Sequence, residues 1–518
     1  MTVAAPVSNR PLKQSFPRIT DSTQFQGREL QELEALLKRT REFCDVHVRP
    51  RALEFDRRAG EDPRDFPWDL AAAGARAGMF SLMLPQGAGG ESNRLCVRSA
   101  LVMEELGAAC SGVATIFGAH ALGLTPLVML GPAMWDGVMR DIFEAEKRGE
   151  PLIFAAAITE PAAGTDYENP QLVRDARLNS HAEKVAGGYR ITSTKRFISN
   201  GSVADWIVVL MPVDPKRPFE TMAGFLVDGK SEGLTVDRVE HKMGQRACPA
   251  AELVLDNVFV PDDKVLGKIG DGVSSTMGVL IASRPVVGAI ATGIARGAYE
   301  RLLEWLINDP EGQPLLERQQ VQLALAQMEE EVHLARQAYL DAATEFDSVS
   351  LGRILQMPVL RMLGKLPSGV RSSRVVQRQL DSELSRAATG SVMRENFEDR
   401  ELTRALAMSS MAKARGGDTA MKVTGMALEI AGLSSGPIRA ELEKLLRDAK
   451  LTQIYEGTNQ LNRLEVFEGL VVERELEMLP DGKPSAYAAS AHPHRQATAA
   501  DLTAKLLSLG ARKNGGSR

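Results

Sequence analysis

The stretch Trp206-Ile207-Val208-Val209-Leu210 decides the fold class of this chain. It is a short apolar run bounded by turn residues, and similar runs follow at 224–227 and 252–255. Short runs rich in Val and Leu are typical of strands in a sheet or small barrel. The sequence therefore predicts a middle β domain over residues 151–272.

In the segments before and after this domain, apolar residues recur with the period of an α-helix. Apolar residues recur there every three or four positions, for example at Leu30, Leu33, Leu36, Leu37, Val321, Leu325, Met328 and Val332. We expect an N-terminal helical domain over 27–150 and a C-terminal helical domain over 273–478. The polar ends, 1–26 and 479–518, are expected to be flexible. The fold class is α+β multidomain, with helices before and after a β domain.

Composition excludes several function classes. The 518 residues carry a mild formal net charge of -5, which gives no reason to expect nucleic acid as a partner. The four cysteines are far apart and fit neither a disulfide framework nor a metal site, so a reducing cytoplasm is expected. We expect no signal peptide and no segment apolar for long enough to cross a membrane.

The segment Tyr455-Glu456-Gly457-Thr458-Asn459-Gln460 offers one carboxylate beside a glycine, a hydroxyl and two amides. No cation neighbours Glu456 in sequence, and this local composition suits a carboxylate that accepts a proton. A glutamate before a glycine is also a common helix end. The segment gains weight only if the rest of the chain supplies a matching site.

Two further segments could hold a planar ligand. Residues 158–166 read Ile-Thr-Glu-Pro-Ala-Ala-Gly-Thr-Asp, where small residues and hydroxyls allow close approach to the backbone. Phe197 and Ser199 lie two positions apart in an expected strand and thus on one side of it. The alternatives are a surface turn for the first segment and a half-buried strand with an Asn-Gly turn for the second.

The remaining polar motifs are less specific. Arg246 and Arg284 could meet an anion, although most arginines are solvated surface residues. His120, on an apolar helix, is expected to be a core histidine and not a metal ligand. The glycines at 267, 270 and 272 lack the spacing of a dinucleotide-binding fingerprint.

The motifs, taken in order, resemble the acyl-CoA dehydrogenase family over about residues 28–475. The resemblance is closest to the medium-chain branch around 105–118 and 284–298. The segments that carry it are Glu104-Glu105-Leu106-Gly107, Thr159-Glu160-Pro161-Ala162-Ala163-Gly164-Thr165-Asp166, Lys242-Met243-Gly244, Val260-Pro261, Leu266-Gly267, Arg284, Arg447-Asp448-Ala449-Lys450 and Tyr455-Glu456-Gly457-Thr458.

The resemblance implies a C-terminal four-helix bundle, a dimeric or tetrameric assembly and FAD between the β domain and the bundle. The residues that it assigns to the flavin are Ile158, Thr159, Thr165, Phe197 and Ser199, with Thr458 and Gln460 on the FAD phosphates. It assigns Thr165, Arg284 and Gly457 to the acyl-CoA. Phe197 replaces the family's usual tryptophan, and Ser199 its usual threonine.

The chemistry that the resemblance implies gives Glu456 its role. Glu456 would remove the α-proton of an acyl-CoA thioester while the β-hydride passes to flavin N5. The Glu456 N–H and the ribityl hydroxyl of the flavin would stabilise the developing enolate. Exclusion of water would raise the pKa of Glu456 towards the working pH.

The chain departs from the family at four places. Asn308 and Glu311 replace an arginine and a phenylalanine that reach the FAD of a neighbouring subunit. A second segment with that contact reads Glu429-Ile430-Ala431-Gly432-Leu433-Ser434-Ser435-Gly436. Ile281 and Glu468 alter positions that bear on CoA binding. An insert at about 348–404 carries many arginines and is either a solvated helical excursion or a docking surface for a partner chain, an acidic carrier or an anionic membrane.

Four functions follow from these features. The first is an active dehydrogenase that passes electrons to an electron-transfer flavoprotein. The second is a subunit of a hetero-oligomer whose partner replaces the altered FAD contacts. The third is an acyl-CoA oxidase or a flavin-dependent monooxygenase on the same fold, although Glu456 argues against the monooxygenase. The fourth is a flavin-poor binding protein. Acyl chain length, and attachment to CoA or a carrier protein, stay open.

Overall fold

The computed structural model describes residues 25–82, 84, 94–130, 132–168, 172–173, 176–349, 399–432, 434 and 436–472. Most of the predicted insert and nearly all of the two predicted flexible ends lie outside these ranges. Within them, the predicted order of helices, β domain and helices is confirmed.

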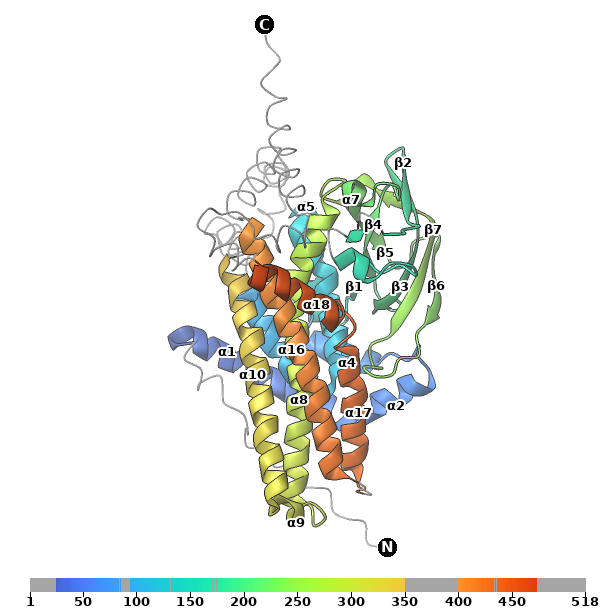
Figure 1. The fold of residues 1–518 in the computed structure, drawn as a ribbon. Coiled ribbons are helices and arrows are strands. Elements are labelled where there is room, and N and C mark those ends of the chain that lie inside the picture. Colours follow the sequence, from blue (N-terminus) through green and yellow to red (C-terminus); the bar gives the residue numbers. More distant parts are fainter. Residues whose placement is uncertain are drawn as a thin grey trace, which may run out of the picture.

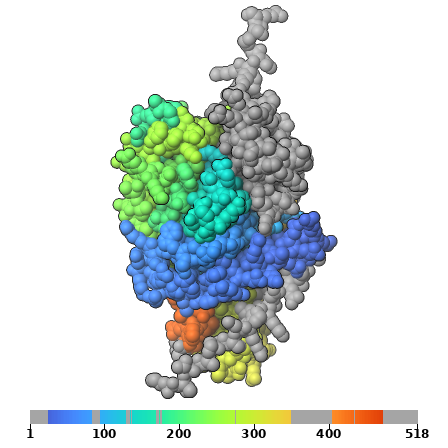
Figure 2. All heavy atoms as spheres, turned by 180° about the vertical axis from the view of Figure 1, so that it is seen from behind, coloured from blue at the N-terminus to red at the C-terminus, as the bar shows by residue number. Residues whose placement is uncertain are grey.

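The N-terminal region is helical. Its helices are α1 (Gly27–Phe43), α2 (Ala52–Glu61), α3 (Trp68–Arg76), α4 (Leu95–Leu130) and α5 (Pro132–Arg148). In Figure 2 the blue part of this region, with α1, α2 and α3, forms a belt below the green β domain, and ends of the C-terminal helices are visible beneath it.

Helix α4 bends sharply at Cys110, whose backbone is extended (φ -163°, ψ 111°). The bend leaves carbonyl groups without their usual helical donors. Arg301 supplies donors, with Nη1 2.9 Å from Ala108 O and Nη2 3.1 Å from Ala109 O. The bend is therefore stabilised by a side chain from the C-terminal domain.

The β domain consists of two four-stranded sheets. The strand orders are β1-β4-β5-β8 and β2-β3-β7-β6. The predicted run at 206–210 lies in β4, which pairs in parallel with β1 and antiparallel with β5. The strands are β1 (Phe154–Ala157), β2 (His181–Val185), β3 (Gly188–Ser199), β4 (Trp206–Pro212), β5 (Met222–Asp228), β6 (Leu234–Val239), β7 (Ala250–Pro261) and β8 (Val265–Leu266), with the short helix α7 (Pro218–Thr221) before β5.

Long helices of the C-terminal domain run side by side along the length of the molecule, and the β domain packs near their upper ends (Figure 1). They are α8 (Gly272–Asn308), α10 (Gln319–Val349), α16 (Asp399–Ala431) and α17 (Pro437–Leu451), with the shorter α9 (Gln313–Leu316) and α18 (Asn459–Val466). Helix α8 is central, since it packs against α4 on one side and α16 on the other.

Glycines permit these close helix contacts. A Cβ atom at Gly107 of α4 would lie 2.6 Å from Ile290 O of α8, and one at Gly288 of α8 would lie 2.7 Å from Ala412 O of α16. No side chain fits at such separations, so the backbones approach one another directly. This packing fixes α8, which carries part of the site described below.

One expectation from the sequence is wrong. Two stretches, Leu95–Leu127 and Ser275–Asn308, are long and apolar enough to cross a membrane. Their most apolar windows are 94% and 72% buried inside the fold, which is also the property of core helices. Hydropathy is high here because α4 and α8 are surrounded by protein on most sides.

All four cysteines are free and buried. The expected core position of His120 is confirmed. His120 is completely buried and accepts the N–H of Phe154 at 3.2 Å. Burial lowers the pKa of this histidine to about 3, so it is neutral in the core.

Candidate active site

The Glu456 turn follows α17 and has an unusual backbone. Glu456 and Gly457 both have positive φ angles, 56° and 84°. A Cβ atom at Gly457 would collide with the Glu168 carboxylate and would lie 2.8 Å from Asn462 Nδ2. The Glu-Gly order is therefore required by the space around the turn as well as by its conformation.

Consecutive residues of α8 hold the two ends of Glu456. The Ser283 hydroxyl donates to Glu456 Oε2 at 2.6 Å, and Arg284 Nε donates to Glu456 O at 3.0 Å. The first contact orients the carboxylate, and the second holds the strained backbone in place.

Arg284 is completely buried, and its remaining N–H groups donate to side chains. Nη1 lies 2.8 Å from Ser410 Oγ and 2.5 Å from Glu465 Oε2, and Nη2 lies 3.3 Å from Glu168 Oε2. The sequence assigned Arg284 to acyl-CoA binding. The structure places it under the Glu456 turn, where its contacts are all to the protein.

Lys413 of α16 completes the support of the turn. Its Nζ donates to Gly457 O and, at 3.0 Å, to Asn459 Oδ1. The buried group beneath the turn thus contains three carboxyls and two cations: Glu168, Glu456, Glu465, Arg284 and Lys413. This catalytic cluster has one more acid than base when all five are charged.

Burial dominates the protonation of the catalytic cluster. It raises the pKa of Glu456, against the Ser283 hydrogen bond and the charges of Arg284 and Lys413. It also raises the pKa of Glu168 to about 7 and, together with Arg284, lowers that of Lys413 to about 7. A carboxyl with a raised pKa is suited to accept a proton near neutral pH.

An apolar cavity of about 150 Å³ lies beside Glu456. Its wall includes Ser283 and Val287 of α8, Gly118 of α4, Phe346 of α10, and Ser199, Tyr455 and Glu456. The Glu456 carboxylate is one of few ionisable groups on a largely apolar wall. Concave apolar sites with few polar groups are typical of ligand pockets.

The 158–166 segment is organised by Glu160. This buried carboxylate accepts Tyr167 OH at 2.6 Å, Asn179 N at 3.0 Å and Lys195 Nζ at 3.0 Å. Ile158 O accepts Lys195 Nζ at 2.8 Å. The segment is therefore a fixed loop, tied into β3, and not a free surface turn.

Thr159 and Thr165, which the resemblance assigns to the flavin, belong to this loop. Thr159 O accepts Arg196 N at 2.9 Å. Thr165 begins a short 3₁₀ turn that ends at Glu168 of the catalytic cluster. The loop thus connects the predicted flavin residues with the Glu456 turn.

Phe197 lies within a bulge of β3 opposite β7, between Lys195 and Ile198, and Ser199 lies beyond it at the end of the strand. Phe197 has a positive φ of 60°, and 55% of its side chain area is exposed. Ser199 lines the cavity, while Ile198 between them is buried. The structure thus brings Ser199 to Glu456 and leaves the Phe197 ring open to a ligand.

The residues present fit the flavin that the resemblance implies. Phe197, Met243 and Ile454 are large apolar side chains that are each more than half exposed. A planar ring that covered Phe197 would bury part of this surface. Thr458 caps α18 by accepting Leu461 N at 3.3 Å, and Gln460 is exposed in its first turn. A helix N-terminus suits phosphate groups.

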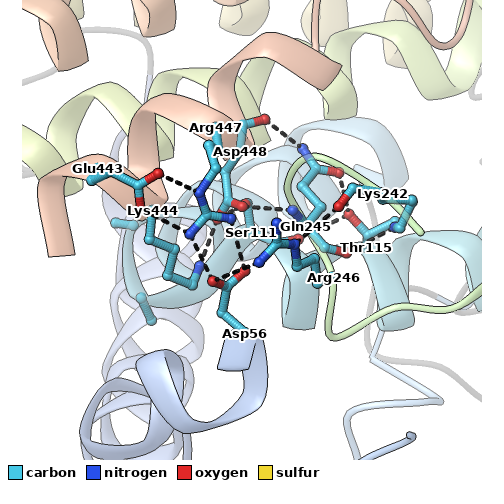
Figure 3. Close-up of polar contacts among 12 residues, drawn as sticks. Asp56, Ser111, Thr115, Lys242, Gln245, Arg246, Glu443, Lys444, Arg447 and Asp448 are labelled. Carbon is cyan, nitrogen blue, oxygen red and sulfur yellow. Dashed lines mark hydrogen bonds and ion pairs between the residues drawn. The ribbon is translucent and has the colours of Figure 1, made fainter. Parts of the chain in front are cut away.

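Figure 3 shows a second buried polar group, around the C-terminal half of α17, which we call the Asp448 network. Asp448 accepts Gln245 N at 2.5 Å, Ser111 Oγ at 2.7 Å and Lys444 Nζ at 2.6 Å. Arg447 adds a pair to Asp56 at 2.7 Å. The network joins α2, α4, the β domain and α17, so it locks the domains around the site.

The altered family positions that the structure describes lie in the C-terminal domain. Asn308, Glu311 and Glu429 are exposed. Glu311 Oε2 accepts the hydroxyl of Ser434 at 3.0 Å, so the two altered segments touch each other. Ile281 is buried on α8, close to Ser283 in sequence. Glu468 lies in the π-helical segment Phe467–Val472.

The sequence analysis did not single out several residues of the site, among them Ser283, Glu168, Lys413 and Glu465. Ser283 stood beside Arg284, and its hydroxyl was a usable signal. Glu168 follows the 158–166 segment by two positions and had no signal of its own. Lys413 is a lysine among small residues on a helix, where a buried position can be inferred only once the bundle is known.

Three family models match the chain. The acyl-CoA dehydrogenase N-terminal domain matches residues 31–134, the middle domain 155–258, and the C-terminal domain 270–364 and 372–471. The match to the C-terminal domain is interrupted only at 365–371, inside the predicted insert.

Curated relatives and solved structures agree with these matches. A cyclohex-1-ene-1-carbonyl-CoA dehydrogenase of Geobacter metallireducens is 30% identical over 84% of this chain and 96% of its own length. A cyclohexane-1-carbonyl-CoA dehydrogenase of that organism is 28% identical over 78% and 88%. The structure of butyryl-CoA dehydrogenase from Megasphaera elsdenii, at 24% identity, covers 85% of this chain and 98% of its own, with a TM-score of 0.66. The chain belongs to the acyl-CoA dehydrogenase family.

Proposed function

We propose that this enzyme oxidises the Cα–Cβ bond of an acyl-CoA thioester, with Glu456 as the base that removes the α-proton. The observation that carries the proposal is the Glu456 carboxylate on the wall of an apolar cavity, with its pKa raised by burial. A charged group beside an apolar surface costs stability. A carboxylate at this position is therefore better explained by a function than by a contribution to stability.

The residues of this chain supply the proton chemistry. Glu456 takes the α-proton as a base, and the electron pair of the broken bond moves towards the thioester carbonyl. Within the described part of the chain, the Glu456 N–H donates to no other group, so it is available to that carbonyl. Donation there would stabilise the enolate charge as it develops.

Enzymes of this family depend on FAD. The hydride that leaves the β-carbon needs an acceptor, and FAD supplies that chemistry when it is bound. Ile158, Thr159, Phe197 and Ser199 would hold its ring, and Thr458 and Gln460 its phosphates. We propose an electron-transfer flavoprotein as the partner that accepts the two electrons afterwards.

The cavity favours a compact acyl group. Its volume of about 150 Å³ is that of an apolar cavity able to hold benzene. A six-membered ring or a short chain fits this space, and the relatives named above act on cyclohexane and cyclohexene carbonyl thioesters. We infer that the substrate carries about six acyl carbons beyond the thioester.

Anaerobic titration of the flavin-loaded protein tests this proposal. The panel is butanoyl-, hexanoyl-, octanoyl-, cyclohexane-1-carbonyl- and cyclohex-1-ene-1-carbonyl-CoA, and flavin absorbance reports reduction. Hexanoyl- and cyclohexane-1-carbonyl-CoA should reduce the flavin fastest, and the cyclohexene thioester, which has no α-proton, should not reduce it by this mechanism. Failure of every thioester to reduce it would reject the dehydrogenase function, and preference for octanoyl would reject the size limit.

The contact between Glu311 and Ser434 favours a second possibility, in which the enzyme is one subunit of a hetero-oligomer. Glu311 replaces a family group that reaches a neighbouring subunit, Ser434 lies in the second altered segment, and here the two residues bond within one chain. The alternative is a hetero-oligomeric acyl-CoA dehydrogenase in which a partner chain completes the FAD site. Native mass measurement after purification decides, because a homo-oligomer with one FAD per chain contradicts a required partner.

A further inference from the structure

Hydroxyl side chains on α8 form hydrogen bonds of two kinds. Thr276 and Thr292 each donate to the carbonyl oxygen four residues earlier, at 2.9 and 2.8 Å. This back-bonding is common for hydroxyls inside helices. Ser283 instead donates at 2.6 Å to Glu456, 173 positions away in sequence. Its hydroxyl is therefore directed into the site by its partner and not by its own helix.

We propose that Ser283 is a positioning residue for proton abstraction, whose hydroxyl holds Oε2 of Glu456 and leaves Oε1 to take the α-proton. The inference rests on the proposed function. Arg284, the next residue, holds the carbonyl oxygen of Glu456 at 3.0 Å. Two consecutive residues of one rigid helix thus fix both the side chain and the backbone of the base.

The step balances with Ser283 unchanged. The α C–H bond breaks, and its proton forms a bond to Glu456 Oε1. The electron pair moves into the Cα–carbonyl bond and then into the Cα–Cβ double bond as hydride leaves the β-carbon. Ser283 keeps its proton throughout, and its hydrogen bond is strongest while Glu456 is ionised.

The charges around Glu456 show why a neutral donor matters. Arg284 of α8 and Lys413 of α16 favour the ionised base, and Glu168 faces the same cluster with the opposite charge. Tyr455 precedes the base and has its pKa raised well above its usual value, so it stays neutral. Ser283 is the group that contacts the carboxylate itself, and it favours ionisation without adding charge to the cavity.

The test compares Ser283→Ala, Ser283→Thr and Thr292→Val in the full-length, FAD-loaded protein. Thr292→Val is the matched control, since it removes a hydroxyl from α8 that only back-bonds. The first readout is the pH profile of kcat/KM with the best thioester of the panel. The second is deuterium incorporation at its α-carbon in D2O, with the flavin kept reduced, which follows proton abstraction without oxidation.

Ser283→Ala should slow α-proton exchange by roughly ten- to hundredfold and move the acid limb of the pH profile to higher pH. Ser283→Thr should restore the position of that limb because its hydroxyl can still donate. The control should match the wild type. Thermal melts and flavin content identify a variant that has lost its fold.

Wild-type exchange and an unmoved acid limb in a folded Ser283→Ala variant would overturn the inference. Glu456→Gln separates this failure from failure of the proposed function. If Glu456→Gln abolishes exchange while Ser283→Ala does not slow it, only the role of Ser283 is lost. If Glu456→Gln exchanges like the wild type, or if the wild type exchanges none of the saturated thioesters, the proposed function itself is rejected.

Discussion

Asp448 lies in α17 and Glu456 lies eight positions later, in the turn that follows this helix; burial acts to raise the pKa of both acids, but their net pKa shifts are opposite. Asp448 accepts hydrogen bonds from Lys444, Ser111 and a backbone N–H (Figure 3). These partners outweigh burial and lower the pKa of Asp448. Among the residues that the structure describes, only the Ser283 hydroxyl, a neutral donor, bonds to the Glu456 carboxylate, and burial raises the pKa of Glu456.

The difference lies in how nearby cations are used. Lys444 donates directly to the Asp448 carboxylate, whereas Arg284 and Lys413 donate to the carbonyl oxygens of the Glu456 turn. The same kinds of residue therefore build a permanent ion pair at one site and a strained, proton-accepting turn at the other. The first arrangement suits stability and the second suits general base catalysis.

Replacement of Glu456 should have the largest effect on activity. Glu456→Gln keeps the shape of the side chain but cannot accept a proton, and it should lower turnover by about 10²–10⁴-fold. Flavin content and melting temperature should stay close to those of the wild type. Steady-state assays with the best thioester measure the change. Turnover within a few-fold of the wild type would remove Glu456 from the mechanism.

Replacement of Asp448 should have the largest effect on stability. Asp448→Asn leaves Lys444 buried without its counter-ion, and the loss should be about 3–5 kcal/mol in the free energy of unfolding. Denaturant titration measures it. The double variant Lys444→Met/Asp448→Asn removes the unpaired charge and should recover part of the loss. A single variant as stable as the wild type would contradict the contrast with Glu456.

The sequence was a good guide to Glu456 and a poor one to its surroundings. The order of helices, strands and helices followed from hydrophobic period, and Glu456 from a short motif whose Glu-Gly backbone the structure requires. Ser199 of β3 lines the cavity, and its predicted contact with the flavin stays a prediction. These features are local in sequence, which is why pattern reasoning reached them.

Long-range packing decided the rest. Glu168, Lys413 and Glu465 come from three separate elements and meet only because α8, α16 and α18 pack around one turn. Arg284 was expected at the acyl-CoA. In the structure its guanidinium group bonds to Glu168 and Glu465, which lie 116 and 181 positions away in sequence. Spacing along the chain carries no information on such contacts.

The pH dependence of the two acids should differ in sign. The pKa of Asp448 is below its ordinary 3.8, so its contribution to stability is full above that pH and is lost as pH falls through the folded value. The pKa of Glu456 is above 4.5, so its contribution is full below that pH and is lost as pH rises through the folded value. Turnover needs the ionised form and should rise with pH over this second range.

A comparison of unfolding free energies between the wild type and Glu456→Gln isolates the second effect. The Gln variant should gain stability relative to the wild type as pH rises above 4.5, in parallel with the rise of wild-type kcat/KM. Denaturant titrations at a series of pH values measure both trends. A constant difference between the two proteins would show that burial does not disfavour the charge of Glu456.

Thr458→Ala should have the smallest effect on stability and activity. It tests whether the conformation of the Glu456 turn depends on the N-terminal cap of α18. Thr458 caps α18 through Leu461 N at 3.3 Å, and loss of such a cap costs about 1 kcal/mol. Arg284 and Lys413 still hold the carbonyl oxygens of Glu456 and Gly457 in this variant, so α-proton exchange should persist when FAD is saturating. Thr458→Ser retains the hydroxyl and is the matched control. If Thr458→Ala lost exchange at saturating FAD while Thr458→Ser kept it, the helix cap would share control of the base, and the turn would depend on α18 as much as on the buried cations.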